Sequence, residues 1–378
     1  MNKMKCLIIG CGKAGNKITN EILAGDKSGQ LVGLFVNTSY NDMANLSKRT
    51  DDNTFLFTST NGSGRDRSIA QSYVKDQIKA LITAITNFPL RDNVYIITSA
   101  DGGTGSGITP MICQLLRNAF DSKGLDRKIN LISIMPNQKT DDPLAFENAI
   151  GFWNDIVKIR KDKQGNEFSI KDKCLDSIKI VDNTKGKNYS DINSRLVQSL
   201  LNSFNMNGVH DEGDIDDKDS FKFNTEKGFS IILNIPSGYN TAKEAIDKAI
   251  SDCIYAVPDN YNCNYLGISL TEEDYLIEEV RDCFPIVNKT TYRTYNNSNH
   301  NTVVLSGCAE PNELITNIAQ KLEDLKTGIT EDSKPKDLTI NIEEGNNNKV
   351  PKKPKVKTSV SFSESELDDI ASSLDDLF

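Results

Sequence analysis

The sequence predicts an α/β protein with a mostly parallel sheet of the Rossmann type, a long central helix, a smaller α+β domain and a disordered tail. Two observations predict this fold. Short apolar runs alternate with helical patterns through the first half of the chain, as they do where helices connect parallel strands. Glycine-rich turns follow several of these runs, at the sheet edge where such folds bind ligands.

The elements of the first half follow from the spacing of apolar residues. Strands are expected at residues 6–9, 31–36, 54–57, 94–98, 129–134 and 178–181. Helical spacing covers residues 69–88 and 111–120. The second of these helices is expected to begin near Thr109 or Pro110, because proline favours the first turn of a helix. The predicted sheet therefore carries helices on both faces.

A long helical pattern follows at residues 190–204, where Ser190 and Asp191 are good capping residues. After an acidic loop at 208–219 the pattern changes to short strands and helices. These are expected at residues 228–235, 242–254, 266–270, 275–284, 301–307 and 313–326. The predicted organisation has four parts: a first domain at 1–189, the central helix at 190–207, the acidic loop with a C-terminal α+β domain at 208–327, and a tail at 328–378.

The tail changes in composition along its length. Residues from 328 onward are rich in Lys, Asp, Asn, Pro and Ser, which indicates disorder, and residues 349–357 hold five lysines. Ser363 and Glu366 then form a candidate capping box for a short acidic helix. Its apolar face would consist of Leu367, Ile370, Leu374 and Leu377. A disordered segment that ends in an amphipathic helix favours capture of a partner over a purely solubilising tail.

Composition argues against several classes of protein. Two histidines argue against a catalytic triad or a histidine-rich metal site, and no metal ligand stands out. Eight cysteines without a Cys-x-x-Cys pair indicate reduced, packed thiols. The net charge of -9 argues against broad contact with nucleic acid, so any direct DNA binding is expected to be weak. No stretch approaches the roughly 18 apolar residues that span a membrane, so we expect a cytoplasmic protein without membrane insertion.

The run from Asp101 to Gly107 is the strongest functional signal. Its glycines leave backbone N–H groups unshielded, and two hydroxyl side chains stand beside them. The residues concerned are Gly102, Gly103, Thr104, Gly105, Ser106 and Gly107. Because the run lies between a buried strand and a helix, it predicts a phosphate cradle rather than a flexible linker.

Two further glycine turns follow other strands. Gly10, Gly12 and Gly15 precede Asn16 at the start of a helix, and Gly62 and Gly64 follow the third apolar run. A dinucleotide site would want an acidic residue after the second strand, but Asn37 stands there. The chain also has no G-x-x-x-x-G-K-[ST] motif. Three glycine turns suit a nucleoside triphosphate that is held by backbone and hydroxyl groups.

With these motifs the chain resembles the tubulin/FtsZ superfamily over roughly residues 4–326, and within it the plasmid and phage TubZ branch. The resemblance implies GTP or GDP with Mg²⁺ as ligands. It assigns to nucleotide binding the glycine turns, Asn16 and Asn37, then Asn183 for the guanine edge, Asp191 and Asn193 for further base contacts, and Asp141 for the ribose loop. One departure is Asp101, which stands where the family signature has its first glycine.

The resemblance also implies where GTP is hydrolysed. Asp211 and Asp214 match a family loop whose two acids position water in the nucleotide pocket of the next subunit, and Asp214 is the first choice. Val209 replaces the asparagine that FtsZ has before its first acid, and Asp216, Asp217 and Asp219 leave the register open. Taken alone, residues 208–219 would be interpreted as an acidic surface loop.

The predicted function is a GTPase that polymerises head to tail into filaments which move or segregate plasmid or phage DNA, with hydrolysis at the subunit interface. A DNA-binding adaptor is expected to contact the tail. The alternatives are a cell-division scaffold of the FtsZ kind, a phage spindle protein and, from another class, an NAD-dependent oxidoreductase. The last would explain Gly10 to Gly15 but not Gly102 to Gly107.

Overall fold

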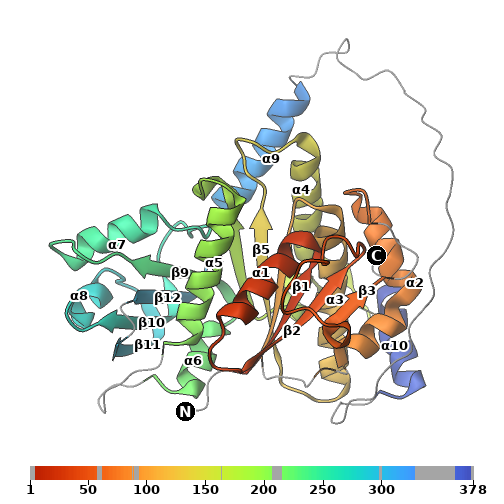
Figure 1. The fold of residues 1–378 in the computed structure, drawn as a ribbon, viewed down its shortest axis with the longest axis horizontal. Helices are drawn as coiled ribbons and strands as arrows, with labels where there is room; N and C mark the ends of the chain where they lie inside the picture. The colour runs from red at the N-terminus through yellow and green to blue at the C-terminus, as the bar shows by residue number, and fades with distance from the viewer. Residues whose placement is uncertain are drawn as a thin grey trace.

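A single large sheet organises the chain in the computed structural model, which describes residues 5–57, 62–86, 88, 93–162, 164–206, 215–297, 300–327 and 362–375 (Figure 1). Its strand order is β11-β10-β12-β9-β8-β5-β4-β1-β2-β3. The strands are β1 (Cys6–Cys11), β2 (Leu31–Asn37), β3 (Thr54–Leu56), β4 (Asn93–Ser99), β5 (Lys128–Met135), β8 (Ser177–Asp182), β9 (Gly228–Ile235), β10 (Cys263–Thr271), β11 (Val287–Asn296) and β12 (Asn301–Cys308). A separate hairpin pairs β6 (Arg160–Lys161) with β7 (Glu167–Phe168).

In the order of the large sheet, the seven strands β9-β8-β5-β4-β1-β2-β3 are all parallel to one another, and helices cover both faces of this part of the sheet. Helix α1 (Gly12–Gly25) packs beside α5 (Tyr189–Phe204) on one face. Helix α3 (Gly103–Ser122) packs between α2 (Arg67–Thr86) and α4 (Pro143–Val157) in the other helical layer. The predicted α/β architecture is confirmed, and the carboxyl ends of β1, β4, β5 and β8 meet at one edge.

The C-terminal strands extend this sheet instead of forming a second one. Strand β9 pairs with β8 only at Ser177 with Gly228 and at Ile178 with Phe229, and beyond β9 the pairing turns antiparallel through β12 to β10. The helices of this half are α6 (Asp217–Asn224), α7 (Ala242–Ser251), α8 (Ile277–Asp282) and α9 (Asn312–Thr327). The division into domains at 1–189 and 208–327 stays a prediction, with one apolar core shared by both halves.

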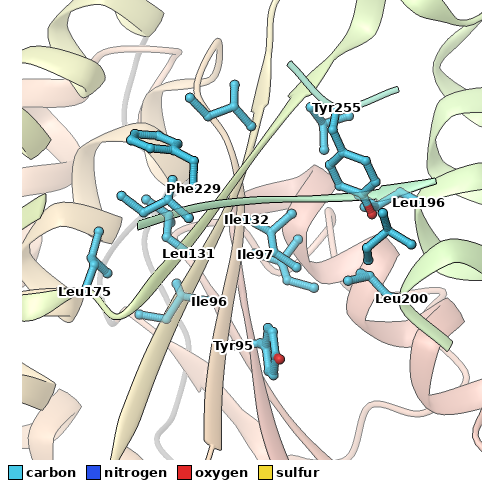
Figure 2. Close-up of a cluster of buried hydrophobic side chains, with 14 of the residues drawn as sticks. Tyr95, Ile96, Ile97, Leu131, Ile132, Leu175, Leu196, Leu200, Phe229 and Tyr255 are labelled. Atoms are coloured by element: carbon cyan, nitrogen blue, oxygen red, sulfur yellow. The ribbon is translucent and has the colours of Figure 1, made fainter. Parts of the chain in front are cut away.

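Helix α5 joins the two halves through the core that Figure 2 draws. Leu196 and Leu200 of this helix lie near Tyr255, and β4 and β5 contribute Ile97 and Ile132. The hydroxyl groups of Tyr255 and Ser199 lie 2.6 Å apart, which satisfies two polar groups inside an apolar cluster. The apolar stripe predicted for residues 190–204 is therefore buried between the halves.

Several element boundaries differ from the predictions. Helix α3 begins at Gly103, so the expected start near Thr109 or Pro110 is wrong, and the glycine run itself forms the first turns. Helix α5 begins one residue early, and Asn188 caps it in place of Ser190 or Asp191. Part of the predicted acidic loop is helix α6. Helix α4 and the edge strand β11 were not predicted.

The C-terminal segment forms helix α10 (Glu364–Asp375). The backbone N–H of Ser363 donates to the Glu366 carboxylate at 2.7 Å, and the backbone N–H of Glu366 donates to the Ser363 hydroxyl at 3.3 Å. These reciprocal bonds confirm the predicted capping box. None of the helices in the described ranges is both long and apolar enough to cross a membrane.

Candidate nucleotide site

A cavity of about 650 Å³ lies at the carboxyl ends of the central strands. It is lined by Cys11, Gly12, Lys13, Ala14, Lys17, Ser39, Asp42, Gly62, Ser63, Gly64, Arg65, Ser99, Asp101, Gly102, Gly103, Thr104, Gly105, Ile134, Asn183, Tyr189 and Asn193. This is the sheet edge where an open α/β fold binds ligands. The three glycine turns, which lie far apart in sequence, all contribute to its wall.

The N-termini of α1 and α3 both meet this cavity. The N-cap residues Cys11 and Gly102 do not cap their helices with a side-chain hydrogen bond, and the first turns hold no acidic residue. By contrast, Asp142, Asn188 and Thr241 cap α4, α5 and α7 with their side chains. The free amides of the first turn and the positive end of a helix dipole attract anions. Two uncapped helix N-termini at one cavity therefore favour an anion with more than one phosphate.

Three glycines of the run, Gly103, Gly105 and Gly107, serve close packing, and Gly102 faces open space. A Cβ on Gly103 would lie 2.6 Å from the Arg65 Cα, and one on Gly105 would lie 2.9 Å from the carbonyl oxygen of Cys11. Gly12, at φ +72°, would meet the Gly105 nitrogen at 2.9 Å. A Cβ on Gly102 would meet nothing within 4 Å. The missing side chains thus let the N-termini of α1 and α3 approach each other.

Hydroxyl groups tie the turns together around Thr104. Its Oγ1 lies 2.7 Å from Thr38 Oγ1 and 3.1 Å from Ser63 Oγ, so three segments share one hydrogen-bonded cluster. Thr104 and Ser63 also line the cavity. The hydroxyl of Ser106 instead donates to the Gly102 carbonyl and is buried inside the helix. Of the two hydroxyl groups expected to face a ligand from the glycine run, only that of Thr104 lines the cavity.

Arg65 brings a positive charge to the cavity wall. Its guanidinium makes a bidentate ion pair with Asp142 at 2.6 and 2.9 Å, and this pair lowers the pKa of Asp142. Arg65 is the one non-glycine residue with positive φ in the described ranges, at 66°. The side chain of Asn148 in α4 donates to the backbone carbonyls of both Arg65 and Asp101 at 3.0 Å. Helix α4 therefore holds two loops of the site in place.

Asp101 brings a carboxylate into the same space. It lines the cavity and accepts a hydrogen bond from the Ser99 hydroxyl. Burial raises the pKa of Asp101, and the Ser99 hydrogen bond partly offsets that rise. Lys13 pairs with Asp42 at 3.4 Å, so the second carboxylate of the wall already has a basic partner. Asp101 is thus the acidic group that a phosphate chain would have to tolerate or bridge through a cation.

The other end of the cavity is built by the turn after β8 and the first turns of α5. Asn183 and Asn193 are buried and line it, and they offer amide groups that can donate and accept hydrogen bonds. The half-exposed ring of Tyr189 lies in the wall beside them, and its hydroxyl donates to Asp141. Amides beside an aromatic ring suit the edge and the face of a nucleobase.

Several sequence-predicted residues support the wall without lining it. They are Gly10, Gly15, Asn16, Asn37, Ser106, Gly107, Asp141 and Asp191. Asn16 donates to the Val36 carbonyl at 3.1 Å, and Asn37 accepts from the backbone N–H of Thr38 at 2.8 Å. Asp191 accepts from the backbone N–H of Lys187 at 3.0 Å. Asp211 and Asp214 lie outside the described residues.

The cavity also has members that the sequence reasoning missed. They are Cys11, Lys13, Ala14, Lys17, Ser39, Asp42, Ser63, Arg65, Ser99, Ile134 and Tyr189. Lys13 and Lys17 could have been found, because they lie in the first turns of a helix that opens with a glycine motif. Arg65 and Tyr189 gave no such signal, since an arginine in a turn and a tyrosine at a helix start are common on protein surfaces.

The residues fit a nucleoside triphosphate better than they fit a metal centre. Two uncapped helix N-termini and three basic side chains, Lys13, Lys17 and Arg65, suit phosphates at one end. The described residues contain no group of three His, Cys, Asp or Glu side chains arranged for a metal ion. A cation here would depend on phosphate oxygens, as Mg²⁺ commonly does with nucleotides. Burial raises the pKa of the Cys11 thiol to about 12, so this thiol is not a nucleophile.

Comparison with known proteins finds a family model that matches the first part of the chain. Residues 5–160 match the model of the Tubulin/FtsZ family, GTPase domain. The chain is 29% identical over 326 residues to the tubulin-like protein TubZ of Clostridium botulinum C phage, and the match covers 85% of this chain and 84% of that protein.

Solved structures agree with this match. The tail-truncated TubZ of Clostridium botulinum phage c-st superposes with a TM-score of 0.73 at 26% identity, covering 86% of this chain and 98% of that one. The GTPγS-form protofilament of Bacillus thuringiensis serovar israelensis TubZ gives a TM-score of 0.70 at 16% identity, covering 86% and 92%, and shows likeness of fold alone.

Proposed function

Because residues 5–160 match the Tubulin/FtsZ family, GTPase domain, we propose that the chain is a GTP-dependent, filament-forming GTPase of the TubZ kind. The observation that carries the proposal is the meeting of the uncapped N-termini of α1 and α3 at one cavity. In the proposed function, filaments move or position plasmid or phage DNA in a bacterial cytoplasm. The TubZ relatives from a phage support this choice over a cell-division scaffold.

Guanine nucleotide binding would use both ends of the cavity. The first-turn amides of α1 and α3, the Thr104 hydroxyl and Arg65 would hold the phosphates, and Mg²⁺ would neutralise part of their charge. Asn183 and Asn193 would read the base edge, with the Tyr189 ring against its face. Asp101 would contact the cation. Hydrolysis requires positioning and charge neutralisation rather than a covalent intermediate.

The acids that orient water are proposed to come from the next subunit, namely Asp214 with Asp211 as the alternate. The described structure gives two of the other acids of that region, Asp216 and Asp219, roles within the subunit itself. Asp216 caps α6 by accepting from the backbone N–H of Asp219 at 2.8 Å, and Asp219 pairs with Lys222 at 3.6 Å. Both side chains therefore have structural partners. A head-to-tail contact that does not close into a ring gives an open filament, as this arrangement requires.

The tail would link the filament to DNA through an adaptor. Residues 349–357 carry five lysines, but the net charge of -9 argues that direct DNA binding is weak. A phage spindle protein remains a close second function, since it needs the same filament and nucleotide chemistry. The alternative of an NAD-dependent oxidoreductase is not supported by the match to a tubulin/FtsZ GTPase domain.

The nucleotide that co-purifies with the protein tests the proposal directly. We expect GTP or GDP in near-equal amount to protein when the purified chain is denatured and its supernatant is analysed by ion-exchange chromatography. Recovery of NAD, or of adenine nucleotides alone, would contradict it.

The concentration dependence of turnover tests the shared active site. The GTPase rate per molecule should rise with protein concentration, because the site is complete only between subunits. Asp214→Ala should keep GTP binding but slow hydrolysis and lengthen filament lifetime, while Asp247→Ala in α7, which removes only an exposed pair with Lys243, serves as a charge-matched control. A rate per molecule that does not change with concentration would count against catalysis across the interface.

A further inference from the structure

The C-terminal helix α10 lies against the body of the protein, far in sequence from the helices that it contacts. Figure 1 shows it beside α2, and it packs on α2 and α3 together. Ile370, on its predicted apolar face, is only 4% exposed and belongs to the continuous core cluster. The described part of the face that the sequence offers for partner capture, Ile370 with the partly buried Leu367, is therefore already covered by the chain's own helices, while the side chains of Leu374 and Leu377 lie outside the described residues.

Charged contacts flank this apolar contact. Lys123 at the C-cap of α3 pairs with Glu366 at 2.7 Å, and its ammonium lies 4.8 Å from the centre of the Phe362 ring. Lys79 of α2 pairs with Asp368. Helix α10 holds five acidic residues and no basic one. The two lysines on the neighbouring helices have the opposite charge and each pairs with one of these acids. The lysine partner lowers the pKa of Glu366 to about 2, which keeps this carboxylate ionised at neutral pH.

Helix α10 depends on this surface for its stability. A helix of its length in isolation is marginal in water, even with a good capping box. Burial of Ile370 and the two ion pairs are contacts that α10 gains only when docked. Slow amide exchange in α10 would therefore show that the helix is docked, and undocking would make these amides exchange faster.

We propose that the face formed by α2 and α3 around Lys79 and Lys123 is a binding site for α10 of the same chain. The docked helix hides Ile370, a central residue of the apolar face that a tail-binding partner would need, so partner binding must compete with this internal contact. Only the identity of that partner, an adaptor, rests on the proposed function. The site itself would accept a short acidic amphipathic helix.

Hydrogen exchange measured by mass spectrometry on the full chain with GDP tests the proposal. We expect amides 364–375 to exchange about tenfold more slowly than those of an undocked helix. Ile370→Asp and Lys79→Glu/Lys123→Glu should each remove this protection. Lys243→Glu breaks an exposed lysine-aspartate pair on α7, on the opposite side of the molecule in Figure 1, and should leave α10 protected.

Charge exchange separates a specific contact from general disruption. Lys79→Glu should weaken protection, and adding Asp368→Lys should restore it. Failure of this rescue, or equal protection in wild type and Ile370→Asp, would overturn the proposal. Protection that disappears on dilution would also overturn it, because it would place α10 on a second copy.

The two proposals fail in different ways. A chain that binds GTP but leaves amides 364–375 unprotected loses the docking site and keeps the proposed function. A chain with protected α10 that binds no guanine nucleotide loses the proposed function and keeps the docking site.

Discussion

Helix α3 contributes to two surfaces that are built in different ways. Near its N-terminus, the cavity wall consists of backbone amides, glycines and short hydroxyl side chains, such as Gly103 and Thr104. Toward its C-terminus, the α10 surface that α3 shares with α2 consists of long side chains, Lys79 and Lys123, around an apolar contact. The cavity wall should be sensitive to added side-chain volume and insensitive to charge on distant side chains. The α10 surface should respond to changes of charge and to salt.

The largest effect on stability and nucleotide binding is expected from adding one methyl group at Gly103, in the cavity wall. Gly103→Ala puts a Cβ into the backbone of Arg65, so we expect a loss of about 2 kcal/mol in the free energy of unfolding and weak GTP binding. Gly102→Ala is the matched control for the free energy of unfolding, because its Cβ meets no protein atom within 4 Å. Chemical denaturation and nucleotide titration measure both. Equal losses in the two variants would mean that close packing is not what the glycines provide.

A smaller effect is expected from removing the cavity carboxylate. Asp101→Asn should tighten GDP binding without Mg²⁺ by about fivefold at pH 7, because a negative charge beside the phosphates disappears. The raised pKa of Asp101 sets the sign of the pH dependence. As pH falls, wild-type Asp101 takes up a proton earlier than an ordinary carboxyl group, so the advantage of the variant should shrink. An advantage that stays constant from pH 8 to 5 would contradict this role.

Salt should separate the two surfaces within one sample. Raising NaCl from about 0.05 to 0.5 M should speed amide exchange in α10 several-fold, since exposed ion pairs are screened. The first turns of α3, at Gly103 to Gly107, should keep their exchange rates because packing and hydroxyl bonds hold them. A parallel change at both places would mean that salt acts on global stability instead.

The smallest effect is expected at the α10 capping box. Ser363→Ala removes the hydroxyl that accepts from the Glu366 N–H, which costs about 1 kcal/mol in a helix. Exchange of amides 364–367 should rise by a small factor while Ile370 stays docked. Ser372→Ala, within the same helix, is the control for substitution on α10. If Ser363→Ala abolished protection along the whole helix, the cap would contribute more than the docked face.

The sequence predicted the strands well where they are buried on both faces. Strands β1, β4 and β5 are continuous apolar runs, and the structure has them within a residue or two of the predicted ends. Strand β11 was missed because it lies at the edge of the sheet, where much of its side-chain surface faces water and its residues are mostly polar. Periodicity detects burial, so an edge strand leaves little trace.

The glycine run shows where local rules fail. Glycine is a poor helix former, and Pro110 indicated a helix start, so residues 102–107 were predicted as a loop. In the structure α3 begins at Gly103 because the missing side chains let it press against the backbone of Arg65, Cys11 and Arg67. Close packing between distant segments outweighs the low helix propensity of this run.

The sequence alone determined the resemblance to the tubulin/FtsZ superfamily, the buried strands of the sheet and the glycine turns that line the cavity, because these depend on local patterns and short motifs. Only the tertiary structure decided which glycines pack and which face open space. It also brought Arg65 and Tyr189 into one wall and seated α10 on α2 and α3. The physical reason is that these contacts join residues distant along the chain, and amphipathicity gives a helix an apolar face without specifying what will cover it.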